Sequence, residues 1–170
     1  MDETRHTQPD LTLEVPPHPA NLAVVRMMIG LIAEAMGFNE TEALQLELSV
    51  DEACSNSIAA MQETEGEAAA GGVRIEITIL EQGLKIAVLD RGRNFADHFE
   101  KAVPFHDGTD RTRPRGYGLQ IIKTCMDEVH YFHEAERGNR LVLTKYRADV
   151  GRPFSIPPSP LPPLGPFEIS

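Results

Sequence analysis

Two segments with a two-residue repeat, joined by a turn, constrain the fold of this chain most strongly. From Val73 to Ile79 every second residue is apolar and alternates with a polar one, and after Gln82-Gly83 the repeat continues as Leu84, Ile86, Val88 and Asp90. Successive side chains of a strand point to opposite faces, so the pattern predicts a β-hairpin with one buried face. Because an isolated hairpin is marginally stable in water, further strands and a covering layer are expected.

The covering layer is indicated by helical periodicity in three other segments. Residues 20–36 carry one apolar stripe, and Gly37 ends that predicted helix. Asn39 and Glu42 have the spacing of a capping box, so a second helix is expected from about residue 40 to 62. A third helix is expected over residues 116–126. The residues expected to face inward are Leu22, Val25, Ile29, Ile32 and Met36 in the first helix, Leu46, Val50, Ala53, Ser57 and Met61 in the second, and Leu119, Ile122 and Met126 in the third.

Three more strands are expected at residues 11–15, 129–133 and 141–146, whereas residues 91–115 show no periodicity. This order of elements predicts an α+β fold. We expect a two-layer α/β sandwich, in which a mostly antiparallel mixed sheet is covered on one face by three helices. Residues 1–10 are expected to be a flexible N-terminus and residues 11–147 the domain. Residues 148–170 are expected to be a proline-rich tail, because residues 151–170 hold 7 of the 13 prolines.

Charge and composition exclude several classes of protein. The formal net charge is −10, and residues 1–66 hold 12 acidic but only 2 basic side chains. This balance disfavours direct binding to nucleic acid. The acidic half would attract a basic protein partner, or is simply a solvated helix face. We expect no membrane span and a cytoplasmic protein, because no apolar run approaches the roughly 20 residues of a membrane helix and the N-terminus is polar.

Three polar motifs are candidates for chemistry. Glu52 and Asn56 are four apart in a predicted helix, so their side chains share a face that suits a magnesium ion or an activated hydroxyl. Asp90 ends an apolar strand shortly before Gly92, and a carboxylate there requires a donor such as a purine amino group. The segment Arg115–Leu119 places two glycines at a helix start, where backbone N–H groups bind phosphate.

Each motif alone also has an ordinary structural explanation. A Glu and an Asn four apart occur on many solvated helix faces, and an Asp-x-Gly sequence often forms a simple turn after a strand. A single Gly-x-Gly often marks a loop, and here the Lys of a Walker A motif and the third Gly of a dinucleotide fingerprint are missing. The order of the three motifs along the chain is therefore more informative than any one of them.

In that order, the motifs resemble the boxes of the Bergerat-fold (GHKL, histidine-kinase-like) ATP-binding superfamily, and within it the small anti-sigma-factor serine kinases. The similar segments are Asp51–Asn56, Asp90–Phe95 and Arg115–Leu119, and the resemblance covers roughly residues 10–147. It implies that ATP and Mg²⁺ are the cofactors. It also implies that Glu52 is the catalytic general base and that Asn56 is the magnesium ligand.

The resemblance further implies which residues contact the nucleotide and where the chain departs from the family pattern. Asp90 would bind the adenine amino group, Gly92 would let the ring pack, and residues 93–115 would form the ATP lid. Ala60 replaces a frequent His, and Asn139 replaces the Thr of a late Gly-Thr pair. The residues implied in ATP binding are Asn56, Asp90, Gly92, Phe95, Arg115, Gly116, Gly118 and Leu119.

As a function, the resemblance implies an anti-sigma-factor serine protein kinase in a partner-switching pathway of transcription regulation. Such a protein binds a sigma factor, phosphorylates a serine of an anti-sigma-factor antagonist and is often a homodimer. The second hypothesis is a non-catalytic, nucleotide-gated protein-binding regulator on the same fold, and the third is a scaffold with a vestigial site. A Glu52→Ala variant separates the first two, because a kinase would lose phosphotransfer whereas a pure binder would lose little.

Overall fold

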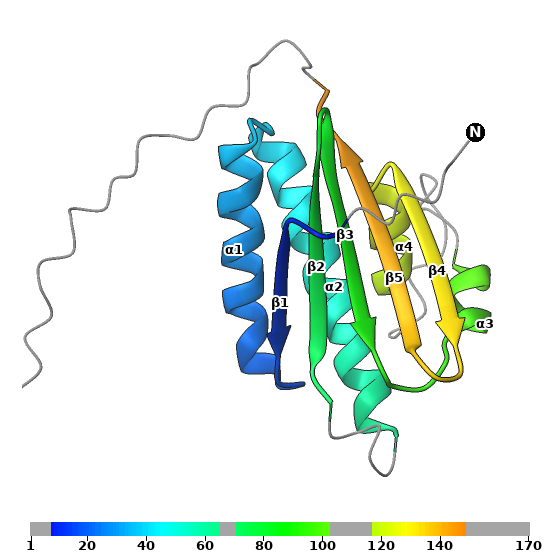
Figure 1. Ribbon diagram of the computed structural model, residues 1–170. Helices are drawn as coiled ribbons and strands as arrows, with labels where there is room; N and C mark the ends of the chain where they lie inside the picture. Colours follow the sequence, from blue (N-terminus) through cyan, green and yellow to red (C-terminus); the bar gives the residue numbers. More distant parts are fainter. Residues whose placement is uncertain (1–7, 65–70, 103–116, 149–170) are drawn as a thin grey trace, which may run out of the picture.

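A five-stranded antiparallel sheet forms one layer of the protein (Figure 1). The computed structural model describes residues 8–64, 71–102 and 117–148. The strands are β1 (Leu11–Val15), β2 (Val73–Leu80), β3 (Gly83–Asp90), β4 (Glu128–Glu134) and β5 (Gly138–Tyr146), in the spatial order β1-β2-β3-β5-β4. The predicted hairpin is β2–β3, which confirms the reading of the alternation. Every pairing in the described part of the chain is antiparallel, so the sheet there has no parallel component.

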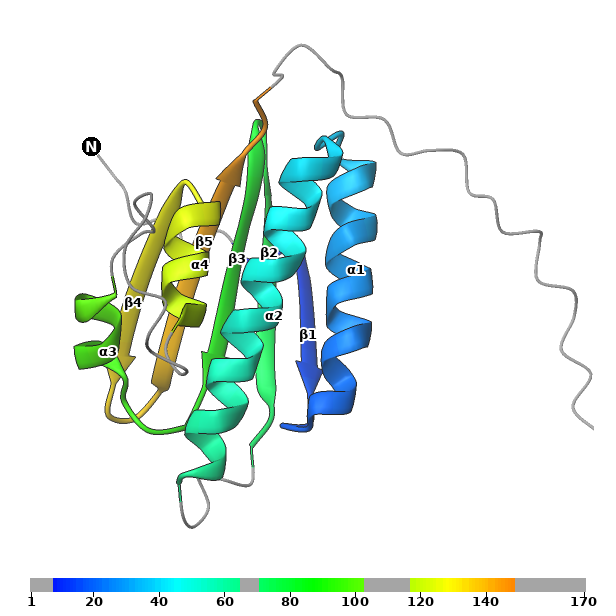
Figure 2. The same cartoon turned by 180° about the vertical axis from the view of Figure 1, so that it is seen from behind.

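Three helices form the second layer and cover one face of the sheet (Figures 1 and 2). They are α1 (Leu22–Ala35), α2 (Glu40–Gln62) and α4 (Tyr117–Cys125), and a short 3-10 helix, η1 (Pro19–Asn21), precedes α1. The predicted α+β sandwich with three helices on one face is therefore confirmed. Within the described residues, no helix is long and apolar enough to cross a membrane.

A fourth helix, α3 (Ala96–Lys101), was not predicted and lies beside the β4 edge of the sheet (Figure 2). It falls in the segment 93–115 that the resemblance assigns to the ATP lid. The helix has only six residues and none of them is buried, so it leaves no apolar stripe in the sequence. The remainder of the expected lid, residues 103–115, lies outside the described residues, as do residues 1–7 and the tail from residue 149.

The two long helices form as their local sequence predicts. The side chain of Asn39 accepts a hydrogen bond from the N–H of Glu42, and the Glu42 carboxylate accepts one from the N–H of Asn39, both at 2.9 Å. This capping box satisfies two backbone donors at the start of α2. Gly37 follows α1 with a φ of +79°, a conformation that favours glycine. All five residues predicted for the inner face of α2, including Ser57, are buried.

The register of the sheet decides which side chains meet under the helices. One row of cross-strand neighbours consists of Leu13, Ile75, Val88, Leu141 and Tyr131. The three central members are buried in the apolar core. In the next row, Asp90 of β3 is opposite Asn139 of β5, and Asn139 is opposite His133 of β4. Since a residue and its cross-strand neighbour share a face, polar groups from three strands gather at one end of the core.

Candidate active site

The carboxylate of Asp90 is the centre of the polar end of the core. Only 4% of this residue is exposed. Its Oδ1 accepts hydrogen bonds from the N–H of Gly92 at 2.8 Å and from Nδ2 of Asn139 at 2.7 Å. Its Oδ2 accepts a bond from the hydroxyl of Ser57 on α2 at 2.6 Å. Three donors therefore hold one buried carboxylate in a fixed orientation, which offsets the cost of burying it.

Gly92 lies against the backbone of α2 rather than in open space. A Cβ on this residue would be 2.5 Å from the carbonyl carbon of Ala60 and 2.6 Å from the nitrogen of Met61. Beside it, the N–H of Arg93 donates to the carbonyl of Ala60 at 3.2 Å. The structure thus gives Gly92 a packing role against α2. Ala60, where the resemblance implies a frequent His, forms the other side of this contact.

Glu52 and Asn56 meet the first turn of α4. A Cβ on Gly118 would overlap Oε2 of Glu52 and would lie 3.5 Å from Nδ2 of Asn56. The pair on α2 and the second glycine motif, separated by more than 60 residues in sequence, therefore form one corner. Leu119, the next residue of α4, is buried in the core. Arg115 and Gly116 lie outside the described residues.

The environment of Glu52 favours a proton acceptor. Burial, followed by the neighbouring carboxylate of Asp51, raises the pKa of Glu52 above its ordinary value of 4.5. A carboxylate with a raised pKa is a stronger base once it is ionised. Cys54, between Glu52 and Asn56 in sequence, points into the core instead. Burial and the charges of Asp51 and Asp90 raise the pKa of its thiol to about 12.

The donor set at this corner fits a magnesium ion. Asn56 offers an amide oxygen and Glu52 a carboxylate, which are the hard ligands that Mg²⁺ prefers. Nδ2 of Asn56 is buried and makes no hydrogen bond among the described residues. The described residues contain no group of three His, Cys, Asp or Glu side chains suited to a metal ion. A magnesium ion bound here would therefore take most of its ligands from phosphates and water.

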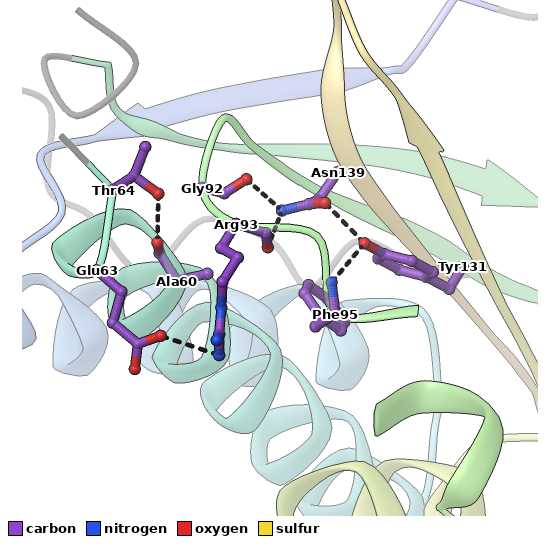
Figure 3. Close-up of polar contacts among 8 residues, drawn as sticks. All are labelled: Ala60, Glu63, Thr64, Gly92, Arg93, Phe95, Tyr131 and Asn139. Carbon is purple, nitrogen blue, oxygen red and sulfur yellow. Dashed lines mark hydrogen bonds and ion pairs between the residues drawn. The ribbon is translucent and has the colours of Figure 1, made fainter. Parts of the chain in front are cut away.

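Phe95, a predicted nucleotide contact, packs on a residue that the sequence interpretation missed. Its ring is 4.3 Å from the ring of Tyr131, and its N–H donates to the Tyr131 hydroxyl at 3.1 Å (Figure 3). Ser57 was also missed as a site residue. A hydroxyl on the predicted inner face of α2 was the signal for it, because a buried hydroxyl requires a partner. No comparable local signal marks Tyr131.

Sequence comparisons with known proteins identify the family of this domain. The sequence profile of the histidine kinase-like ATPase domain matches residues 15–145. The chain is 30% identical to the serine-protein kinase RsbW of Bacillus subtilis over 142 residues, which cover 80% of this chain and 84% of that protein. It is 31% identical to the protein of the same name from Listeria monocytogenes serotype 4a over 140 residues, covering 80% and 86% of the two chains.

The fold, the meeting of the three motifs and these similarities agree. The family profile covers most of the described domain, from the end of β1 to the last strand. The chain therefore belongs to the histidine kinase-like ATPase domain family, and within it to the serine-protein kinase family that includes RsbW.

Proposed function

We propose that this protein is an ATP- and Mg²⁺-dependent anti-sigma-factor serine kinase. In this proposal it binds a sigma factor and phosphorylates a serine of an anti-sigma-factor antagonist. The observation that carries the proposal is the double role of α2. This helix holds Glu52 and Asn56 against the first turn of α4, and one residue later it holds Ser57 against Asp90. One helix thus fixes the separation between the Glu52–Asn56 pair, which is assigned to phosphate transfer, and the Asp90 carboxylate, which is assigned to base recognition.

The chemistry assigned to these residues follows from their surroundings. Phosphoryl transfer depends mainly on positioning and on neutralising charge. Asp90 accepts a hydrogen bond from the purine amino group, and the backbone N–H groups at the start of α4 face the phosphates. Glu52 takes the proton of the attacking serine hydroxyl as the oxygen bonds to the γ-phosphorus. The bond between that phosphorus and the oxygen that bridges it to the β-phosphate breaks, and ADP leaves with the bonding electron pair. Magnesium, when held through Asn56, supplies charge neutralisation at the phosphates.

The surface of the domain supports a protein partner. Several large apolar side chains are exposed on α1, with exposed fractions of 61% for Val24, 67% for Met27 and 63% for Leu31. Leu44 on the neighbouring helix α2 is 63% exposed. Val24, Met27 and Leu31 share one face of α1 by their helical spacing, and exposed apolar residues grouped in this way are typical of protein–protein contacts. We therefore also propose protein partners for this chain, the sigma factor and the antagonist, together with a homodimer and a cytoplasmic location.

Calorimetric titration of ATP with Mg²⁺ into the wild type and Asp90→Asn tests the nucleotide site. The amide replaces one acceptor oxygen with a donor, so Asp90→Asn is expected to lose most of the affinity. Asp10→Asn is the matched control, because Asp10 is exposed beside the edge strand β1, away from Asp90 on the central strand β3, and an amide oxygen still accepts from the N–H of Ile79. Absence of binding by folded wild type at millimolar ATP would reject both ATP-dependent hypotheses.

Transfer of labelled phosphate to an antagonist protein tests catalysis separately. Glu52→Gln is expected to abolish transfer while ATP affinity stays close to that of the wild type. Under the alternative hypothesis, a nucleotide-gated binding protein without catalysis, the wild type binds ATP and transfers no phosphate. Retention of sigma-factor binding by Glu52→Gln would show that binding and transfer are separate properties of the domain.

A further inference from the structure

The hydroxyl of Tyr131 lies between the base-binding carboxylate and the start of α3. It is 2.7 Å from Oδ1 of Asn139, and it accepts a hydrogen bond from the N–H of Phe95 (Figure 3). It also lies 2.9 Å from Oδ1 of Asn94. A phenol has one proton to donate, yet two amide oxygens lie within reach. The hydroxyl therefore donates either to the Asn139 side or to the Asn94 side at any moment.

The side-chain amide of Asn139 links the Tyr131 hydroxyl to the carboxylate of Asp90. Its Nδ2 lies 2.7 Å from Oδ1 of Asp90, 3.2 Å from the carbonyl of Gly92 and 3.1 Å from the carbonyl of Arg93. Figure 3 shows this amide between the loop that follows β3 and the Tyr131 ring. Because Oδ1 and Nδ2 belong to one planar amide, a group that orients Oδ1 also orients the N–H that reaches Asp90.

The hydrogen bonds at Asp90 leave a single direction for a ligand. A carboxylate has about four acceptor positions, two on each oxygen. The N–H of Gly92 and the amide of Asn139 occupy Oδ1, and the hydroxyl of Ser57 takes one position on Oδ2. One position on Oδ2 remains for a donor. If Asn139 released its bond, the carboxylate would offer a second position and could turn.

We propose that Tyr131 is a positioning residue for nucleobase recognition. Acting through Asn139, its hydroxyl fixes the acceptor position that Asp90 presents to the base. The same hydroxyl contacts Asn94 and Phe95, so it also links this hydrogen-bond network to the start of α3. The inference rests on the proposed nucleotide site at Asp90 and assigns a specificity role to a residue that does not itself touch the nucleotide.

The surroundings of Tyr131 keep the hydroxyl in this role. Burial, opposed by the hydrogen bond from Phe95 and reinforced by the charge of Asp90, raises the pKa of Tyr131, so the phenol keeps its proton. The ring packs on Phe95 and, at 5.6 Å, on Phe99, so its position does not depend on the hydroxyl. Nδ1 of His133 lies 2.9 Å from Oδ1 of Asn139 and is a second donor to that oxygen when its tautomer carries the proton.

The test is the ratio of the dissociation constants for ITP and ATP, measured by calorimetry with Mg²⁺. ITP carries an oxygen in place of the purine amino group, so it lacks the donor that Asp90 requires. Tyr131→Phe removes the hydroxyl and keeps the ring. It is expected to reduce the ITP/ATP ratio by a factor of about 3 to 10, the value of one hydrogen bond. Loss of folded protein would change both constants equally and leave the ratio unchanged.

Two further variants complete the design. In an Asn139→Ala background, adding Tyr131→Phe is expected to change the ratio no further, because Tyr131 acts through Asn139. Tyr146→Phe is the matched control, since the Tyr146 hydroxyl donates to Glu128 at 2.9 Å at the other end of β5. An unchanged ratio in Tyr131→Phe protein whose circular dichroism spectrum matches that of the wild type, or additive effects in the double variant, would overturn this inference alone. Absence of ATP binding by the folded wild type would overturn the proposed function as well.

Discussion

At the residue scale, the protonation of Glu52 links the site to the stability of the fold. Burial raises the pKa of this carboxyl in the folded state above its ordinary value of 4.5. The folded protein therefore binds the proton more tightly than the unfolded chain does. Stability from this group is present at pH values below 4.5 and is lost as the pH rises through the folded pKa.

Glu52→Gln is therefore expected to gain stability relative to the wild type as the pH rises. Glutamine has similar size and carries no charge, so it avoids the cost of an ionised carboxylate in this position. Urea unfolding of both proteins at pH 4 and pH 7.5 measures the difference. The stability of the variant relative to the wild type should be greater at pH 7.5 than at pH 4. A difference that does not change with pH would mean that Glu52 titrates alike in the folded and unfolded states.

Gly118 gives a sharper test of geometry at the same scale. A Cβ there would overlap Oε2 of Glu52, the end of a flexible side chain that can move aside. Gly118→Ala is thus expected to fold normally, helped by the roughly 1 kcal/mol by which alanine favours a helix. It should lower the rate of phosphotransfer at least about tenfold, because misplacing a catalytic group is costly.

Gly30→Ala is the matched control for Gly118→Ala. Gly30 lies within α1, and a Cβ on it would overlap Oε1 of Glu47 on α2 in the same way. The two substitutions thus displace a glutamate of the same helix, one at the site and one away from it. Equal loss of phosphotransfer in both variants would mean that the effect comes from disturbing α2 and not from moving the base.

At the scale of elements, α2 is the helix on which the whole site depends. It spans 23 residues and carries Glu52, Asn56 and Ser57 in its C-terminal half. Its start is defined by the capping box of Asn39. Asn39→Ala removes the side-chain acceptor for the N–H of Glu42 and is expected to lower the free energy of unfolding by about 1 kcal/mol.

Chemical denaturation of Asn39→Ala and Asn21→Ala checks this value. Asn21 is at the N-cap of α1, but its side chain makes no capping hydrogen bond. Its Nδ2 donates instead to the carbonyl of Pro16 in an exposed position. Asn21→Ala should therefore cost clearly less than Asn39→Ala. An equal cost would attribute the stabilisation to residue preference at the cap rather than to the capping box.

The same scale shows what could be predicted from the sequence and what could not. Helix α2 and the β2–β3 hairpin were predicted because each buries one face, so apolar residues repeat with the period of the element. Helix α3 buries no residue and left no such pattern. The three motifs of the site were recognised by their order, and the structure brings Glu52, Asn56 and Gly118 together.

At the scale of the whole molecule, strand order assembles the part of the site that local patterns do not reveal. Asn139 follows Asp90 by 49 residues and becomes its neighbour because β5 inserts between β3 and β4. The β4–β5 hairpin brings Tyr131 within reach of Asn139. Periodicity predicts each strand but not that β5 lies beside β3, so the connection of these two residues to Asp90 could be placed only by the structure.

The end of the domain is also defined by contacts between distant segments. After β5, the guanidinium of Arg147 donates to the carbonyl of Met36 at 3.0 Å and to that of Glu81 at 3.2 Å. The N–H of Ala148 donates to Oε1 of Glu42 at 2.7 Å, and both Arg147 and Glu42 are buried. These bonds join the end of the sheet to the α1–α2 turn and to the β2–β3 turn.

Two truncated chains, residues 1–148 and 1–146, test whether these last two residues belong to the domain. Both lack residues 149–170, so they differ only in Arg147 and Ala148. The shorter chain loses these three bonds and also the bond from the N–H of Arg147 to the carbonyl of Gln82 at 2.9 Å. At about 1 kcal/mol for each of the four hydrogen bonds, it is expected to be less stable by roughly 4 kcal/mol in chemical denaturation. ATP affinity should be the same in both folded chains, because the bonds lie at the end of β5 opposite Asn139. Equal stability would place the boundary of the domain at Tyr146, since the contacts of Arg147 and Ala148 would then contribute nothing to folding.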